Sequence, residues 1–421
     1  MGRILCVWEL GADFGHMSRF LPLALKLRER GHDVSFVLRD LSNAESILGQ
    51  HGFPLLQAPI WLAPVPNLPK PPLNYTEILF RCGFLSKPGL TGVVKGWREL
   101  YGFVKPDVIL ADHSPTALLA ARGLPFKRCL VGTGFFSPPR VSPFPTMRPW
   151  LKVPPERLPD GERSVLETSN AVLTHFGVKP MKALHEIFDV DEDFLCTFPE
   201  LDHYANRGPA RYWSPVFAKD HGLDLTWPQT QGKRVFAYLK PRYRDYEKIL
   251  ALLRQVKGTV IVFSPGISKA MLQKYRSPRM TISTEPVKLA GITGGCDLAI
   301  CHAGPGTCAA MLLAGVPLLL LPTQLEQYMA ASRVAQLGAG VMISERPPDE
   351  QQPAQKAQGL SPQQKAPEPN YRALLIRLLS RPAFAARAKA FAAKHADFDQ
   401  AAQCEAMARR MEELLGGRSA S

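Results

Sequence analysis

Residues 301–308 carry side chains and spacings suited to binding a phosphate. Gly304 and Gly306 are small enough to let a phosphate approach the backbone. The expected helix after them would offer unpaired N–H groups and a partial positive charge. Thr307 could cap that helix or donate to a phosphate oxygen, and His302 could hydrogen-bond a phosphate at the loop entrance. A purely structural strand-to-helix turn is the alternative that this motif alone leaves open.

A carboxylate beside an amide follows about 20 residues later. Glu326 and Gln327 come directly after the apolar run 318–321, which has the character of a buried strand. Loops at the carboxyl ends of parallel strands bind ligands in open α/β sheets. A carboxylate–amide pair there could bind the hydroxyls of a sugar in one orientation. The alternative is a solvated helix start, where glutamate is favoured.

The N-terminal half offers a candidate general base. His16 follows the apolar run 4–8 and a glycine-containing loop, and an imidazole can take a proton from a hydroxyl near neutral pH. Asp112 ends a later apolar run at the same expected edge and could orient the imidazole. Asp13 is an alternative partner, and His113 is a further candidate at this edge. Taken alone, His16 could also be an ordinary loop or capping residue.

The elements that must position these residues belong to an α/β chain. Ile4–Trp8 and Val34–Leu38 read as strands, and the glycine loop and helix between them end at Gly31. This βαβ pattern predicts a parallel sheet with a right-handed crossover. A second series begins near Lys233 and includes an expected helix at Thr307–Ala314. We therefore predict two Rossmann-like domains facing across a cleft.

The chain is predicted to divide into an acceptor half and a donor half. Residues 1–215 form the expected N-terminal acceptor domain, and 216–232 the linker. Residues 233–400 form the expected donor domain, with a mobile Pro/Gln-rich loop at 346–370. Residues 401–421 are expected to form a C-terminal helix that packs back onto the N-terminal domain.

Charge and composition restrict the class of protein. The net charge is +14, and residues 216–421 hold 27 basic and 16 acidic residues, against 24 and 21 in residues 1–215. An excess of basic residues suits a polyanionic ligand or an anionic membrane face, although a generally basic soluble surface explains it equally well. No apolar run approaches the roughly 20 residues that span a bilayer, and none of the eight cysteines forms a CxxC pair. A cytoplasmic protein is expected, with peripheral contact at the inner membrane face left open.

The combined pattern resembles the donor signature of the UDP-glycosyltransferase family, which includes plant natural-product, animal glucuronosyl and bacterial macrolide glycosyltransferases. The matching residues are His302-x-Gly304-x-Gly306-Thr307, Ala314-Gly315-Val316-Pro317 and Glu326-Gln327. The resemblance implies the GT-B fold, a diphosphate held by His302, Gly304, Gly306 and Thr307, and a donor sugar held by Glu326 and Gln327. It also implies that His16 is the general base and that Asp112 orients it.

Two positions depart from the family pattern. Family members often have Ser or Thr after the first strand of the second domain, whereas Lys240 stands here and could supply charge to the phosphate. The plant enzymes stack a Trp on uracil, whereas the corresponding stretch has Val287 and no aromatic residue. The choice between uridine and thymidine therefore stays open, with a UDP-sugar favoured.

The sequence therefore predicts an inverting glycosyltransferase that moves a hexose from a nucleoside-diphosphate sugar to a small-molecule hydroxyl. No metal or cofactor is expected, because the loops assigned to the site hold no Asp-x-Asp pair. No nucleic acid partner is expected, and the sequence indicates no oligomeric state. One alternative is a lipid or membrane-linked acceptor, suggested by the mixed apolar and basic stretch 59–104, and another is a non-catalytic nucleotide-sugar-binding protein.

Overall fold

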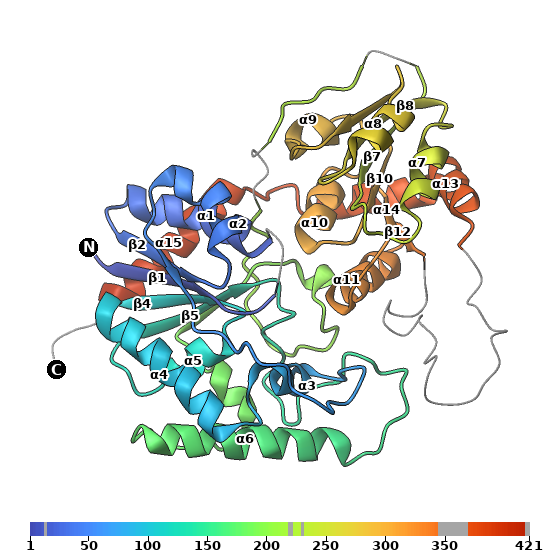
Figure 1. Ribbon diagram of the computed structural model, residues 1–421. Coiled ribbons are helices and arrows are strands. Elements are labelled where there is room, and N and C mark those ends of the chain that lie inside the picture. The colour runs from blue at the N-terminus through green and yellow to red at the C-terminus, as the bar shows by residue number, and fades with distance from the viewer. Residues whose placement is uncertain (12–14, 218–221, 229–230, 344–368, 417–421) are drawn as a thin grey trace. The chain divides into compact units, whose positions relative to one another are not determined.

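The computed structural model describes residues 1–11, 15–217, 222–228, 231–343 and 369–416. Asp13 and almost all of the expected mobile loop 346–370 lie outside these residues. The chain forms two compact units (Figure 1). The first unit comprises Met1–Phe217 and Asp399–Ser421, and the second comprises Ala218–Phe398.

The first unit is built on a parallel sheet. Its strand order is β3 (Leu55–Gln57), β2 (Asp33–Leu38), β1 (Arg3–Trp8), β4 (Val108–Asp112), β5 (Lys127–Gly132) and β6 (Glu192–Leu195). The central strands β1 and β4 are buried almost throughout, as expected of apolar strands covered on both faces. Because all neighbours pair in parallel, the strands end at one common edge of the sheet.

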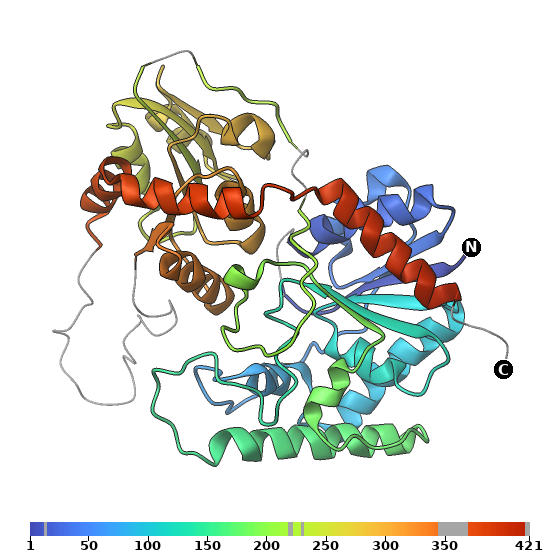
Figure 2. The same cartoon turned by 180° about the vertical axis from the view of Figure 1, so that it is seen from behind.

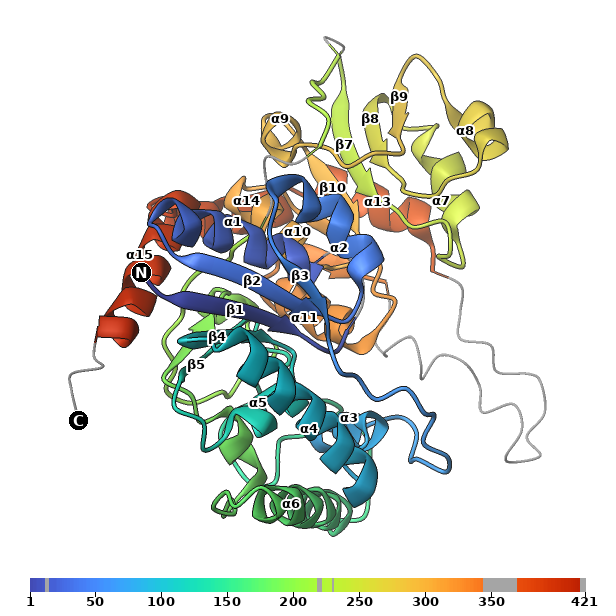
Figure 3. The ribbon, with the colours of Figure 1, turned by 60° about the vertical axis from the view of Figure 1, so that its left-hand side comes forward.

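Helices cover both faces of this sheet (Figure 3). One face carries α1 (Gly15–Glu29) and α2 (Leu41–Ile47), and the other carries α4 (Lys87–Val104) and α5 (Pro115–Ala121). The remaining helical elements of the unit are α3 (Tyr75–Leu79), α6 (Arg157–His175) and the short turns η1 (Gly49–His51), η2 (Phe80–Cys82), η3 (Leu184–Phe188) and η4 (Pro199–Leu201).

The C-terminal helix α15 (Gln400–Gly416) belongs to the first unit, where it packs beside α1 (Figure 2). Met407 and Met411 are fully buried in the core that α1 and β1 also line. The carboxylate of Glu412 accepts hydrogen bonds from Arg30 and lies 3.0 Å from His32 Nε2. Its pKa is lowered to about 2, chiefly by the bonds from Arg30 and His32. The buried apolar face of α15 and the ionic contacts of Glu412 thus hold α15 against the N-terminal part of the first unit.

The second unit repeats the plan. Its parallel sheet has the strand order β12 (Gly340–Met342), β11 (Leu318–Leu320), β10 (Leu298–Cys301), β7 (Lys233–Tyr238), β8 (Gly258–Phe263) and β9 (Met280–Ser283). The helices are α7 (Tyr246–Leu253), α8 (Lys269–Tyr275), α9 (Leu289–Thr293), α10 (Pro305–Leu313), α11 (Leu325–Gln336), α13 (Tyr371–Ser380) and α14 (Pro382–Lys394). The predicted fold class, two Rossmann-like α/β domains with parallel sheets, is confirmed.

Part of the stretch expected as a linker packs against the second unit. Leu223 forms a parallel bridge with Val287. Trp227 is buried, and its indole N–H donates to the carbonyl of Ile292 over 2.8 Å. Among the described residues, no helix is both long and apolar enough to cross a membrane.

Candidate active site

The first unit brings together His16, Asp112 and Arg19. His16 lies in the first turn of α1, just after β1, and Asp112 is the last residue of the neighbouring strand β4. His16 Nδ1 lies 2.9 Å from Asp112 Oδ2, and the same oxygen accepts a hydrogen bond from Arg19. His16 and Asp112 are 7% and 1% exposed, so this is a buried, charge-assisted network.

The protonation of this network follows from its charges. Burial opposes ionisation of Asp112, but the charges of Arg19 and His16 and the hydrogen bond from His16 outweigh it, so the pKa of Asp112 is lowered. An ionised carboxylate accepts, so Nδ1 of His16 must donate and Nε2 of the neutral ring keeps its lone pair. Gly11 stands in front of that nitrogen, since a Cβ there would lie 2.4 Å from Nε2. Glycine at this position therefore leaves the imidazole room.

Aromatic rings fix the orientation of the imidazole. His16 stacks on Trp8 with ring centroids 5.1 Å apart, and Phe136 lies 5.7 Å away. His113, with a φ of 44°, stacks on Phe136. Both of its ring nitrogens are buried without a hydrogen-bond partner in the described part of the chain, and burial lowers its pKa well below the usual value. Thus His113 is held neutral and packs as an aromatic ring beside the His16 pair.

In the second unit, the glycine loop ends in the first turn of α10. Gly304 is the N-cap and Pro305 the first helical residue, so the helix begins two residues before the predicted Thr307. Of the two roles expected for Thr307, capping the helix is therefore wrong, and donation to a phosphate oxygen stays a prediction. Proline is favoured at the first helical position because its fixed φ suits the helix, which moves the start forward. Thr307 instead lies in the first turn, where its N–H and that of Gly306 have no intrahelical acceptor.

Packing does not account for the glycine at position 304. Its φ of −62° and ψ of 130° are accessible to any residue, and a Cβ built there would meet no atom within 4 Å. Gly304, Gly306 and Thr307 are all partly exposed, whereas the flanking Cys301 and Cys308 are buried. Within the described part of the chain, the space next to Gly304 at the start of α10 is thus open to a ligand.

His302 joins three loops of the donor unit. The ring is 3% exposed, its Nδ1 lies 2.9 Å from the carbonyl of Leu321, and its Nε2 accepts from the backbone N–H of Lys240 over 2.9 Å. It therefore connects the ends of β7, β10 and β11 and is a neutral, Nδ1-protonated ring. A direct bond from His302 to phosphate, as the resemblance implies, would have to replace one of these contacts.

The carboxylate–amide pair lies at the start of α11. Glu326 and Gln327 are in its first turn, after the end of β11, which neighbours β10 in the sheet. The amide oxygen of Gln327 accepts from the N–H and hydroxyl of Thr323, both over 2.8 Å. This fixes the rotamer and leaves the amide N–H₂ of Gln327 to donate. Because β10 and β11 are adjacent, this turn and the loop before α10 share one edge of the sheet.

Lys240 and Val287, the two departures from the family pattern, differ in whether they lie at the edge of the sheet that holds the donor loop. Lys240 follows β7 at that same edge and its backbone N–H contacts His302. Val287 is only 7% exposed and its backbone pairs with Leu223. Its side chain therefore offers little surface on which a base could rest.

Comparison with known proteins adds a family match in the second unit. Residues 247–386 match the family described as "Erythromycin biosynthesis protein CIII-like, C-terminal domain". This range includes α10, α11 and the loops before them. No curated protein shows significant sequence similarity to the chain.

Solved structures match the chain over nearly its whole length. The calicheamicin glycosyltransferase CalG4 is 18% identical, with coverage of 100% of this chain and 99% of that one and a TM-score of 0.68. SsfS6 of Streptomyces sp. SF2575, complexed with thymidine diphosphate, is 17% identical, with coverage of 98% and 100% and a TM-score of 0.63. Spinosyn rhamnosyltransferase SpnG, complexed with spinosyn aglycone, is 18% identical, with the same coverage and TM-score.

The chain has the GT-B fold. The predicted resemblance to the UDP-glycosyltransferases and the predicted enzyme class, glycosyltransferase, are confirmed by the family match together with this fold.

Within the GT-B fold, the stretch that suggested a membrane contact places its apolar side chains both in the interior and on the surface. Phe84 and Trp97 are fully buried and Phe80 is 8% exposed, whereas Leu85 is 41% exposed. In the same stretch, Leu62 is 84% and Phe103 is 78% exposed. The apolar side chains of this stretch are therefore divided between the interior and the surface, and the membrane-linked acceptor stays a prediction.

Two ionisable residues near the His16–Asp112 pair were not predicted from the sequence, the partly buried Arg19 and the buried Glu9. Arg19 lies three residues after His16 on α1, a spacing that places both on one helix face and could have indicated it. Glu9 is 1% exposed and accepts from the backbone N–H groups of Thr116 and Ala117, at the start of α5. Burial raises its pKa to about 7, although these hydrogen bonds act in the opposite direction.

Proposed function

We propose that the chain transfers a sugar from a pyrimidine nucleoside-diphosphate donor to a hydroxyl of a small-molecule acceptor by inverting, metal-independent displacement. The observation that carries the proposal is the buried His16–Asp112 pair at the end of one sheet, combined with an unobstructed helix start beside Glu326–Gln327 in the other unit. A non-catalytic sugar-binding protein would have no use for an oriented base.

His16 and Asp112 carry out the proton transfer of the proposed reaction. Nε2 of His16 takes the proton of the acceptor hydroxyl while Asp112 stabilises the imidazolium that forms. The acceptor oxygen attacks the anomeric carbon, and the bond from that carbon to the phosphate oxygen breaks on the opposite side, which inverts the configuration. The nucleoside diphosphate leaves with the bonding electron pair.

The leaving group gains negative charge as this bond breaks. The first-turn N–H groups of Gly306 and Thr307 and the N-terminal end of α10 can stabilise it, with Lys240 as an added positive charge. We assign the donor sugar hydroxyls to Glu326 and the amide N–H₂ of Gln327. These groups provide charge stabilisation from the protein itself, which supports metal independence and the absence of a cofactor.

The acceptor and the base of the donor are the finer parts of the proposal. Among the structural neighbours, SpnG is complexed with spinosyn aglycone, which supports a small-molecule acceptor. SsfS6 and VinC are in complex with thymidine diphosphate. The resemblance to the family favours a uridine donor, whereas these two complexes favour a thymidine donor. We propose that the chain prefers a thymidine-diphosphate sugar.

A thermal-shift screen separates the two bases. Thymidine diphosphate at about 100 times its Kd should stabilise the folded chain by about 2.7 kcal/mol. Uridine diphosphate at equal concentration should do less, and guanosine diphosphate should leave the melting temperature unchanged. Equal shifts with all three would contradict base recognition, and no shift with any of them would remove the donor proposal itself.

Arg19→Gln is expected to move the acid limb of the pH profile of kcat/KM to higher pH. Arg19 lowers the pKa of Asp112, and without it the effect of burial raises that pKa. The ionised partner of His16 would then be lost earlier as the pH falls. The measurement is the pH–rate profile of the two proteins, and Arg19→Lys should restore part of the shift. An unchanged acid limb with a lower rate at every pH would mean that Arg19 only supports the fold.

A further inference from the structure

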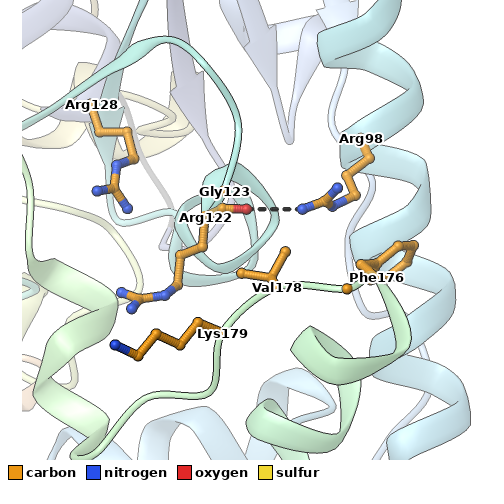
Figure 4. Close-up of a pocket in the computed structure, with 8 residues that line it drawn as sticks. Arg98, Arg122, Gly123, Arg128, Phe176, Val178 and Lys179 are labelled. Carbon is orange, nitrogen blue, oxygen red and sulfur yellow. Dashed lines mark hydrogen bonds between the residues drawn. The ribbon is translucent and has the colours of Figure 1, made fainter.

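The first unit contains a hollow of about 360 Å³ that no step of sugar transfer uses. Its lining includes four basic side chains, Arg98, Arg122, Arg128 and Lys179 (Figure 4). Arg128 is the second residue of β5 and pairs with Ile109 of β4. The hollow therefore lies toward the amino ends of the strands, at the opposite edge from Asp112.

Two of these arginines bind backbone carbonyls but keep a buried N–H group without a hydrogen-bond partner among the described residues. Arg98 donates from Nη2 to the carbonyl of Arg122 over 2.9 Å, and its guanidinium lies 4.8 Å from the ring centroid of Phe176 (Figure 4). Arg122 donates from Nη1 to the carbonyl of Glu186 over 2.6 Å, with its Nη2 3.6 Å from that residue's carboxylate. The Nε atoms of Arg98 and Arg122 are both buried and lack a hydrogen-bond partner among the described residues.

The other two basic groups have no partner for their charge. Within the part of the chain that the structure describes, neither the Arg128 guanidinium nor the Lys179 ammonium forms a hydrogen bond or an ion pair. Asp191, the acid beside Arg128, is bonded to Lys127 and to the backbone N–H of Arg128. No carboxylate lines the hollow, although Glu186 lies behind Arg122.

This arrangement is unfavourable without a counter-charge. Burial and the nearby charge of Arg128 lower the pKa of Arg122, although Glu186 acts in the opposite direction. Burial also lowers the pKa of Arg98. The three arginines are partly buried and Lys179 is exposed, so their like charges repel one another at the rim of the hollow, and a bound anion would reduce that repulsion. Rigid anchoring of Arg98 and Arg122 by backbone carbonyls fixes where that anion would bind.

We propose that this basic pocket binds a small phosphate-bearing anion. Guanidinium groups bind phosphate through paired N–H donors, and four positive charges favour a ligand with two or more negative charges over a monocarboxylate. The Phe176 ring and the Val178 side chain give the hollow an apolar wall, which suits an ester group attached to the phosphate. Free phosphate, pyrophosphate and a sugar phosphate share this chemistry. The site does not depend on the proposed transfer reaction.

Calorimetric titration of the full chain at low ionic strength tests the pocket. Phosphate, pyrophosphate and glucose 6-phosphate are titrated separately, and binding to the donor loop contributes equally to the wild type and to the variants. The variant Arg128→Gln/Lys179→Gln removes the two charges that form no hydrogen bond or ion pair among the described residues. Lys70→Gln/Lys87→Gln is the matched control, because both lysines are exposed residues of the same unit and the net charge changes equally.

We expect at least one of the three anions to bind the wild type, at least tenfold weaker binding to the pocket variant, and a change of less than twofold in the control. Melting temperatures measured without anion establish whether both variants fold. If the pocket double variant does not fold, the single variant Lys179→Gln takes its place. Equal binding to wild type and pocket variant overturns the proposal, as does the absence of wild-type binding to all three anions. The comparison of glucose 6-phosphate with the inorganic anions identifies the source of the phosphate.

Discussion

His16→Ala is expected to reduce sugar transfer by about 10²–10⁴-fold while leaving nucleotide binding unchanged. His16 is the proposed base that takes the proton from the acceptor hydroxyl. The adjacent His113 cannot replace it, because both of its ring nitrogens are buried. The proposed donor residues lie in the other unit. Removal of the ring should therefore lower kcat and leave the thermal shift by nucleoside diphosphate at its wild-type value.

Two further variants make this result specific. Asp112→Asn keeps the shape but removes the charge that orients the ring and favours the wrong tautomer of His16, so a loss of similar size is expected, again with unchanged nucleotide binding. His51→Ala removes a partly exposed imidazole of the same unit, in η1, and should retain wild-type transfer. If His16→Ala transfers at the wild-type rate, His16 is not the base. If it also loses nucleotide binding, the ring is needed for the structure of the whole chain.

The donor loop could be predicted because its signals are local. A buried strand, small residues and a helix start follow one another within about a dozen residues, and each has a direct backbone consequence. The helix start was misplaced by two residues because Pro305 was not recognised as the first helical residue. Composition and periodicity were sufficient for the two parallel sheets, since buried strands read as continuous apolar runs.

Contacts between distant residues could not be predicted in this way. Asp112 is 93 residues from Arg19, and only the sheet order brings the end of β4 beside the start of α1. The backbone contacts of both ring nitrogens of His302 could not be predicted either, because their partners, Lys240 and Leu321, follow other strands. Val287 was expected to contact the base, but it is buried and its backbone pairs with Leu223, more than 60 residues earlier. Side-chain partners of this kind are set by packing rather than by pattern.

Gly304→Val is expected to leave the protein folded and to weaken nucleoside-diphosphate binding by about 100-fold or more. The backbone at Gly304 is ordinary, and no atom of the described residues lies within 4 Å of the position of its missing Cβ, so the described fold does not require a glycine there. Loss of the favourable N-cap residue should cost about 1 kcal/mol of stability. An isopropyl group would instead stand where the diphosphate must approach the N–H groups of Gly306 and Thr307.

Gly294→Val is the matched control for this experiment. Gly294 is an exposed glycine of the same unit, with a φ of −64° and equally empty space around it. Because it lies at the end of α9 and outside the proposed donor loop, the same added volume should not alter nucleotide affinity. The measurement is the Kd of nucleoside diphosphate by calorimetry, together with the melting temperature of each variant. If both variants bind as the wild type does, the start of α10 does not hold the diphosphate. If both lose binding, the loss reflects a general disturbance of the unit, and the open space at Gly304 has no special meaning.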